Sequence, residues 1–151
     1  MRVFKFGGAS VKDADGIKNV YDVLQKVGYE DVLLVVSAMG KTTNALEDVI
    51  KNYFEKSEEL NSSVQEVKKY HNQILLDLFE DEKNEVFAAV NALFSELEYF
   101  LAHNKSPNYN FVYDQIVSYG ELISTTILSH FMNFMGIKTQ WLDVRNYIKT
   151  N

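Results

Sequence analysis

The fold of this chain is decided near its start by the stretch Lys5-Phe6-Gly7-Gly8-Ala9-Ser10. Residues 1–6 are a short apolar run typical of a strand, the paired glycines end it, and Ser10 opens a helical pattern. Glycine lets the backbone approach a ligand closely, and helix starts present unpaired N–H groups. A strand that runs through glycines into a helix is therefore suited to holding an anion.

Lys5 strengthens this interpretation. We expect the strand to be buried on both faces, where a lone ammonium group among Val3, Phe4 and Phe6 is unfavourable unless a negative group meets it. The alternative is a lysine whose apolar stem leaves an edge strand and whose charge lies in water beside an ordinary turn. The local pattern leaves both interpretations open.

The next elements predict a parallel sheet. Residues 12–28 follow a helical period and end near Gly28, a suitable C-terminal cap. Residues 31–37 contain the continuous apolar run Val32-Leu33-Leu34-Val35-Val36. Apolar strands without polar alternation, separated by a helix, are typical of parallel strands covered on both faces, so we expect a right-handed βαβ unit.

The rest of the chain is mostly helical. Apolar residues recur at helical spacing in three successive segments, with polar breaks at 61–63 and 81–84. We expect a further helix over 112–135, interrupted around 118–121, and a third strand over 138–142. The predicted fold is α/β in three layers, with a three-stranded parallel core and a thick helical insertion between strands two and three.

Composition restricts the classes of function. The chain has 151 residues, enough for one domain, with 46% apolar and 24% charged residues, which is ordinary for a soluble protein. A net charge of -6 without a basic run argues against binding nucleic acid. The absence of cysteine excludes disulfides and thiolate metal sites. No run is long enough to span a membrane and no signal peptide is visible, so we expect a cytoplasmic protein.

The histidines of the helical region do not indicate a metal site. His71 and His103 stand singly, without partners at ligand spacing. We expect both to be ordinary residues on helix surfaces.

A second loop follows the second strand. It reads Ser37-Ala38-Met39-Gly40-Lys41-Thr42-Thr43-Asn44, and the carboxyl ends of parallel strands are where α/β proteins place ligands. Thr42, Thr43 or Asn44 would equally serve as a plain helix cap. A P-loop is excluded because Val35 stands where its first glycine is required. The dinucleotide fingerprint fails as well, since Gly7, Gly8 and Gly16 lack its spacing.

A third motif is Ser118-Tyr119-Gly120-Glu121. Serine followed three residues later by glutamate is a capping box, which would start a helix at Leu122. Gly120 then needs another reason, because glycine in a helix costs about 1 kcal/mol relative to alanine. Close approach of a backbone or a ligand would supply that reason, and Glu121 would then face a small cationic group.

These three motifs and the closing Trp141-Leu142-Asp143-Val144-Arg145 occur in one order. In that order the chain resembles the N-terminal part of the aspartate kinases, which are members of the amino-acid kinase family. The resemblance covers essentially all 151 residues but only about the first half of that family's catalytic domain. It implies that the nucleotide-binding half and the regulatory ACT domains are absent from residues 1–151.

The resemblance also implies roles for individual residues. Lys5 matches the family lysine that contacts the phosphates and stabilises charge during transfer. The first glycine loop approaches the phosphoryl group and is represented here by Gly7, Gly8 and Ser10. Ser37 matches a serine close to both the reacting phosphate and the substrate.

The substrate side is implied in the same way. Thr43 matches a threonine that helps to bind aspartate, and Glu121 matches the carboxylate that receives the substrate's amino group. Ala9 stands where the family more often has threonine, which puts a side-chain contact there in doubt. Asp143 and Arg145 match a segment whose role we expect to be structural.

The reaction implied by the resemblance is transfer of the ATP γ-phosphoryl group to the side-chain carboxylate of L-aspartate. It gives 4-phospho-L-aspartate, the first step toward lysine, threonine and methionine. ATP and Mg²⁺ are the implied cofactors. The resemblance implies that Mg²⁺ is held mostly through phosphates and by residues outside this chain. No residue of this chain is assigned as a metal ligand. The alternatives are a kinase for glutamate or acetylglutamate, or an aspartate-binding or oligomerisation module without catalysis. We expect the chain alone to be inactive and to self-associate through exposed apolar surface.

Overall fold

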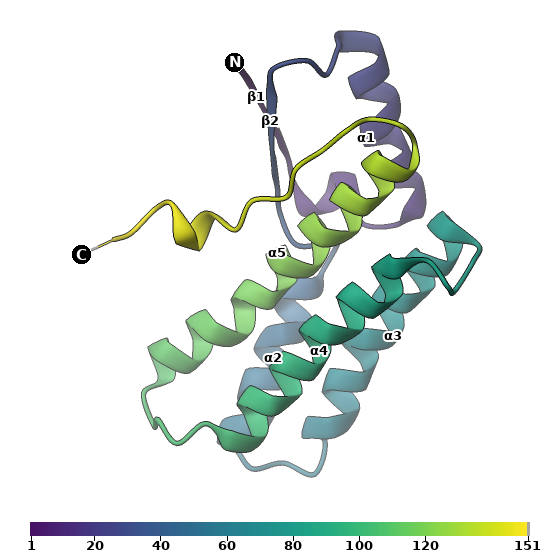
Figure 1. Cartoon of the computed structure of the whole chain (residues 1–151). Coiled ribbons are helices and arrows are strands. Elements are labelled where there is room, and N and C mark those ends of the chain that lie inside the picture. Colours follow the sequence, from purple (N-terminus) through teal and green to yellow (C-terminus); the bar gives the residue numbers. More distant parts are fainter. Residues whose placement is uncertain (151) are drawn as a thin grey trace.

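A computed structural model describes residues 1–150 of the chain (Figure 1). Two short strands and one helix form a small α/β unit, and the four helices that follow form a bundle beside it. The elements in chain order are β1 (Arg2–Phe6), η1 (Gly8–Val11), α1 (Ala14–Val27), β2 (Val32–Val36), α2 (Thr42–Phe54), α3 (Leu60–Phe79), α4 (Glu85–His103), α5 (Tyr109–Phe134) and η2 (Val144–Asn146).

The two strands pair in parallel, with Arg2 opposite Val32 and Phe6 opposite Val36. This confirms the predicted β–α–β arrangement and the α/β class. The first helical turn after β1 is the 3₁₀ turn η1, and α1 begins only at Ala14 after an Asp13 cap. Gly28 ends α1 with a φ of 83°, as the sequence predicted for a glycine cap.

The prediction that both faces of the sheet are buried is wrong. Phe4 and Leu34 pack on the core, whereas Val3 and Val35 remain 58% and 43% exposed. Lys5 shares that open face and is exposed too. The physical reason is that α1 and α5 cover one face of the sheet, and no element within residues 1–150 covers the other.

The predicted third strand over 138–142 is also wrong, and the sheet formed by residues 1–150 has two strands. The backbone of Thr139 pairs with a side chain rather than with a strand. Its N–H donates to Asn133 Oδ1 at 2.8 Å, and its carbonyl accepts from Asn133 Nδ2 at 3.1 Å. Trp141 Nε1 then donates to Thr125 Oγ1 at 2.9 Å, which holds the segment against α5.

Of the two polar breaks predicted between helices, one is wrong and one is confirmed. The polar break expected at 61–63 is wrong, because α3 begins at Leu60 and those residues form its first turn. The break at 81–84 is confirmed. There Asn84 caps α4 by accepting a hydrogen bond from the Val86 N–H at 3.0 Å, an arrangement that satisfies one of the unpaired donors at a helix start.

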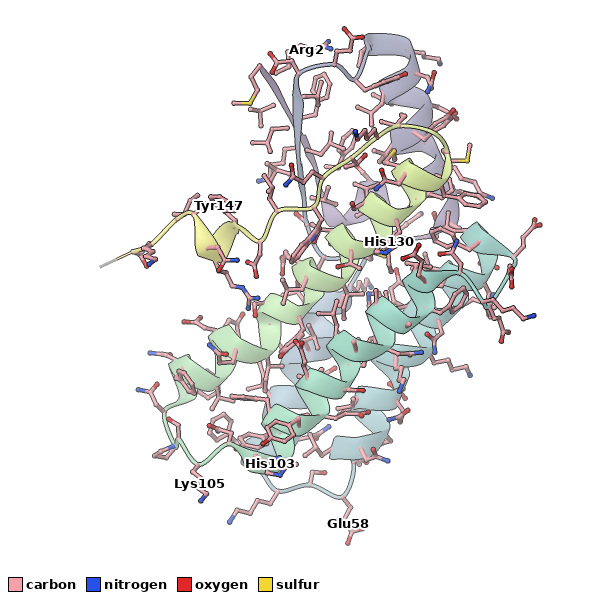
Figure 2. All side chains as sticks on the ribbon, in the orientation of Figure 1. Arg2, Glu58, His103, Lys105, His130 and Tyr147 are labelled. Atoms are coloured by element: carbon pink, nitrogen blue, oxygen red, sulfur yellow. The ribbon has the colours of Figure 1, made fainter. Side chains whose placement is uncertain are left out.

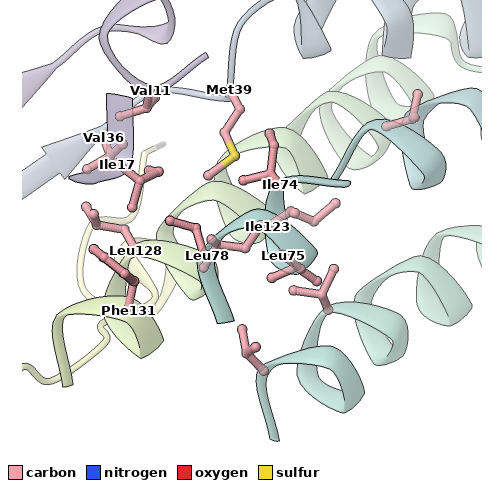
Figure 3. Close-up of a cluster of buried hydrophobic side chains, with 14 of the residues drawn as sticks. Val11, Ile17, Val36, Met39, Ile74, Leu75, Leu78, Ile123, Leu128 and Phe131 are labelled. Atoms are coloured by element: carbon pink, nitrogen blue, oxygen red, sulfur yellow. The ribbon is translucent and has the colours of Figure 1, made fainter. Parts of the chain in front are cut away.

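One core joins the small α/β unit to the bundle (Figure 3). Figure 3 labels Val11, Ile17, Val36 and Met39 from the N-terminal unit, Ile74, Leu75 and Leu78 from α3, and Ile123, Leu128 and Phe131 from α5. Val11 ends η1 and Met39 lies in the loop after β2, and both are fully buried. Each glycine loop is therefore anchored in the core by one apolar side chain.

Among the helices of residues 1–150, none combines the length and the apolar character that a membrane span requires.

Candidate functional site

The two glycine loops meet at the carboxyl edge of the sheet. The Ser37 N–H donates to the Phe6 carbonyl at 3.0 Å, which continues the strand pairing by one residue. The Gly40 N–H then donates to the Gly8 carbonyl at 3.0 Å. Two motifs separated by about 30 positions along the chain therefore form one continuous surface.

Gly8 is required by this junction, whereas Gly7 is not. A Cβ at Gly8 would lie 2.8 Å from the Ala38 carbonyl oxygen, closer than real Cβ atoms come, and 3.0 Å from that of Gly40, tighter than most real contacts. A Cβ at Gly7 would meet nothing within 4 Å, and Gly7 has an ordinary φ of -77°. Loop packing thus explains one glycine of the pair.

The third motif joins the same junction, although not as a capping box. That prediction is wrong because α5 is continuous from Tyr109 to Phe134, and Ser118 Oγ donates to the Gln115 carbonyl within the helix at 3.0 Å. Gly120 is buried, and its Cβ would lie 2.9 Å from the Ala38 Cβ. The expected close approach is therefore confirmed, with the Ala38 loop as the approaching segment.

The predicted site residues lie around Ala38, on different elements. Glu121 follows Gly120 directly and is exposed on α5, while Thr43 lies half-buried in the first turn of α2. Ser37 is half-buried at the end of β2, and Ser10 is exposed in η1. The fold thus collects residues from the three motifs at one end of the sheet.

Lys5 lies two residues before the glycines, on the open face of β1. The expectation of a buried lysine is wrong, because no element within residues 1–150 covers that face of the sheet. Its ammonium group is exposed to solvent, so burial does not demand a negative partner. The proposed contact with phosphate rests on the position of Lys5 next to the glycine loop and on the family motif.

The start of α2 is open toward the loops. Its cap residue is Lys41, which makes no side-chain capping hydrogen bond, so the prediction of a Thr42, Thr43 or Asn44 cap is wrong. Thr42 Oγ1 instead donates to the Met39 carbonyl at 2.6 Å. The first N–H groups of a helix carry partial positive charge, and an uncapped start beside two glycine loops suits an anion.

His71 and Tyr70 of α3 lie against the loops, with Tyr70 37% exposed. The prediction that His71 is a surface residue is wrong, since it is fully buried. Its Nδ1 lies 2.8 Å from the Val67 carbonyl oxygen, and its Nε2 lies 3.4 Å from Thr42 Oγ1. The sequence carried a signal: His71 falls four residues after Val67 and three before Ile74, on the apolar face of α3.

Burial shifts the pKa values of both α3 side chains. Desolvation lowers the pKa of His71, and the hydrogen bond to the Val67 carbonyl opposes that shift. Desolvation also raises the pKa of Tyr70, with a smaller contribution from the negative charge of Asp13. At neutral pH His71 is therefore a neutral imidazole in the core.

The buried imidazole predicts a dependence of stability on pH. Its folded pKa is lowered, so as pH falls below about 6.5 the unfolded chain binds the proton first. The contribution of His71 is fully present above that pH and is lost as pH falls toward the lowered value. Urea unfolding at about pH 7.5 and about pH 5 should show a smaller loss of stability for His71→Gln than for the parent.

The matched control is His103→Gln. Its ring is exposed on α4 and makes the same type of bond, with Nδ1 2.9 Å from the Tyr99 carbonyl oxygen. Figure 2 places His103 at the end of the bundle far from the sheet. An equal loss of stability in the parent and in His71→Gln would contradict the prediction.

The closing segment is held by a local ion pair. Arg145 Nη2 lies 2.6 Å from Asp143 Oδ2, and the Arg145 N–H also donates to Asp143 Oδ1 at 3.0 Å. Hydrogen bonding from the guanidinium is the main reason that the pKa of Asp143 is lowered. These contacts fit the structural role that the sequence predicted for the pair.

A shallow groove lies between α4 and α5. Its lining residues are Ala92, Ser95, Glu96, Tyr99, Phe100, His103, Asn104 and Tyr119. They include none of the predicted site residues, so this groove is separate from the loop junction.

Comparison with known proteins gives a consistent result. The sequence model described as "Amino acid kinase family" matches residues 1–151. The chain is 28% identical to the bifunctional aspartokinase/homoserine dehydrogenase 2 of Escherichia coli (strain K12) over 148 residues, which are 98% of this chain and 18% of that protein. It is 31% identical to aspartokinase 1 of Arabidopsis thaliana, covering 93% of this chain and 25% of that protein.

Solved structures show the same likeness. Aspartokinase III of E. coli, crystallised with aspartate and ADP in its R-state, superposes with a TM-score of 0.85 at 26% identity and covers all of this chain. The same enzyme with lysine and aspartate, in its T-state, gives a TM-score of 0.79 at 27% identity. The chain spans 33% of the first of these structures and 25% of the Arabidopsis aspartokinase.

Proposed function

This chain belongs to the amino acid kinase family, and from that premise we propose that it forms the substrate-side part of an aspartate kinase. The reaction is transfer of the γ-phosphoryl group of ATP to the side-chain carboxylate of L-aspartate, giving 4-phospho-L-aspartate. The observation that carries this proposal is the meeting of three motifs at Ala38. Gly8 bonds to Gly40 there, and Gly120 packs against Ala38.

The proposed chemistry depends mainly on charge and position. The reaction brings two anions together, the γ-phosphate and a carboxylate, so their repulsion must be offset and their geometry fixed. In this proposal Lys5 contacts the phosphates, and Gly7, Gly8, Ser10 and Ser37 surround the phosphoryl group. Backbone N–H groups of the loops and the open start of α2 add fixed partial positive charge.

The substrate would be held from two helices. Thr43, in the first turn of α2, offers a hydroxyl to L-aspartate. Glu121 presents its carboxylate from α5 to the substrate's amino group. Its neighbour Gly120 fixes the distance between α5 and the loop, because its missing Cβ allows contact with Ala38. The two helices thus set the width of the proposed substrate site.

Within the part of the chain that the structure describes, carboxylate and imidazole groups do not gather as a resident metal ion would need. Within residues 1–150, no group of three or more His, Cys, Asp or Glu side chains lies close enough together to hold a metal ion. We therefore propose that Mg²⁺ enters with ATP and is held through phosphate oxygens, with protein ligands from outside residues 1–150.

The experiment that tests the function uses a composite enzyme, defined as this chain joined to the part of E. coli aspartokinase III that follows the matched third. Hydroxylamine converts an acyl phosphate into a hydroxamate, whose coloured complex with Fe³⁺ measures the product. Product with L-aspartate and none with L-glutamate or N-acetylglutamate supports the proposal. A preference for either of the other two acceptors would favour the alternative kinases.

The 151-residue chain by itself is expected to give no acyl phosphate, because it spans a third of the length of the E. coli enzyme. Hydroxamate formed by the purified chain with ATP and L-aspartate would contradict this. Calorimetry on the same sample separates the second class of function. Binding of L-aspartate without any binding of ATP would favour an aspartate-binding module.

Two further expectations concern location and assembly. We propose a cytoplasmic protein that forms homo-oligomers. The open face of the sheet supports self-association, since Val3, Leu33 and Val35 are 58%, 39% and 43% exposed and contiguous exposed apolar surface favours contact.

A further inference from the structure

Helix α3 carries none of the motifs that define the site, yet two adjacent residues of α3 contact the segments that do. Tyr70 reaches the end of the first loop and packs against the second. His71, the next residue, reaches the start of α2. The proposed catalytic groups lie on other elements, so α3 supports the loops.

Tyr70 connects the two loops directly. Its hydroxyl donates to the Lys12 carbonyl, just after η1. The same hydroxyl would lie 2.6 Å from a Cβ at Gly40, a residue whose φ is +54°. The left-handed backbone is the reason that residue 40 is glycine, and the Tyr70 hydroxyl occupies the space beside it. The hydroxyl oxygen is thus bonded to the end of the first loop and lies beside the second.

His71 extends the support to α2. Its ring is fully buried, with Nδ1 bonded to the Val67 carbonyl and Nε2 facing Thr42 Oγ1. Phe94 of α4 lies edge-on to the ring with centroids 5.9 Å apart. Thr42 in turn donates to the Met39 carbonyl. The ring orientation is thus fixed on three sides, and the fixed ring supports the turn at 39–42.

We propose that Tyr70 and His71 are positioning residues that hold the two glycine loops in register for phosphoryl transfer. Neither side chain touches substrate in this proposal. The effect on phosphoryl transfer rests on the proposed function. A displacement of 1 Å at a reacting group lowers the rate by about 100-fold. Support of the Gly8–Gly40 junction is therefore a requirement of the reaction as well as of the fold.

The first test measures hydrogen exchange at the Gly8–Gly40 junction in the 151-residue chain. The Gly40 N–H donates to the Gly8 carbonyl, so its hydrogen exchange reports on separation of the loops. Tyr70→Phe removes one hydrogen bond and should raise the Gly40 exchange rate by about 10-fold. The amide of Ile127, buried in α5, should keep its rate. Tyr99→Phe, at an exposed tyrosine of α4, is the matched control.

The second test separates the two ring nitrogens of His71. An Asn side chain places a polar atom near the Nδ1 position and a Gln side chain near the Nε2 position. His71→Gln should therefore preserve Gly40 protection better than His71→Asn. If both variants change Gly40 and Ile127 exchange equally, the role of His71 is general packing, and the proposal is overturned for that residue.

The third test measures turnover in the composite enzyme. Tyr70→Phe should lower kcat by about 10-fold or more, through misplacement of the reacting groups, with the KM values for L-aspartate and ATP within about twofold. An unchanged kcat, or unchanged Gly40 exchange, overturns the proposal. If the parent composite enzyme makes no acyl phosphate, the proposed function fails, while Gly40 exchange still decides whether α3 holds the loops.

Discussion

Lys5→Ala in the composite enzyme is expected to lower kcat by about 100- to 1,000-fold, the usual loss when one group that stabilises transition-state charge is removed. Lys5 is exposed on the open face of β1, so its side chain contributes little to packing. The free energy of unfolding should therefore change by less than about 0.5 kcal/mol. Loss of turnover without loss of stability is the signature of a group that acts on the phosphates.

The measurement is a hydroxamate assay with urea unfolding on the same preparations. Lys18→Ala provides the matched control, because it removes an exposed lysine of α1 that no part of the proposed site includes. Lys5→Arg tests geometry, since a guanidinium keeps the charge but binds phosphate differently from an ammonium group. A kcat of Lys5→Ala within twofold of the parent would remove Lys5 from the proposed mechanism.

Gly8→Ala is expected to destabilise the chain by about 1–3 kcal/mol, the typical cost of overpacking a well-packed site. Its new Cβ would lie 2.8 Å from the Ala38 carbonyl oxygen and 3.0 Å from that of Gly40. Both atoms belong to backbone, so no side-chain rotation relieves the contact and the loops must separate. In the composite enzyme kcat should fall by about 100-fold, because the separation displaces the reacting groups.

Gly7→Ala is the matched control for stability. It makes the same chemical change one residue earlier, where a Cβ would meet nothing within 4 Å. Its free energy of unfolding should stay within about 0.5 kcal/mol of the parent, because alanine also restricts the unfolded chain. Equal destabilisation by the two substitutions would show that the Gly8–Ala38 contact is not what constrains the first loop.

The sequence predicted positions at which the backbone needs a glycine, although not which segment approaches each of them. Paired glycines after an apolar strand, a glycine cap at Gly28 and a glycine at position 120 each indicate a turn, a left-handed residue or a close approach. All three appear in the structure as the Gly8–Gly40 junction, the φ of 83° at Gly28 and the contact of Gly120 with Ala38. Three of the motifs that carry the family resemblance meet at these contacts.

Other features depend on segments far apart in the chain, and sequence patterns alone did not determine them. A Ser–Glu spacing reads as a cap at 118–121 only if a helix begins there, and packing along α2 and α4 keeps α5 continuous. A strand pattern at 138–142 needs a neighbouring strand, and its backbone pairs with Asn133 instead.

The sequence by itself thus determined where the backbone bends, because steric limits on φ and ψ act within a few residues. Only the tertiary structure decided which surfaces are covered. Lys5 is exposed because nothing in residues 1–150 packs on its face of the sheet. His71 is buried because α2 and α4 close over it, with Thr42 and Phe94 in contact. Burial is a property of neighbouring elements, so the role of α3 against the glycine loops became visible only in the fold.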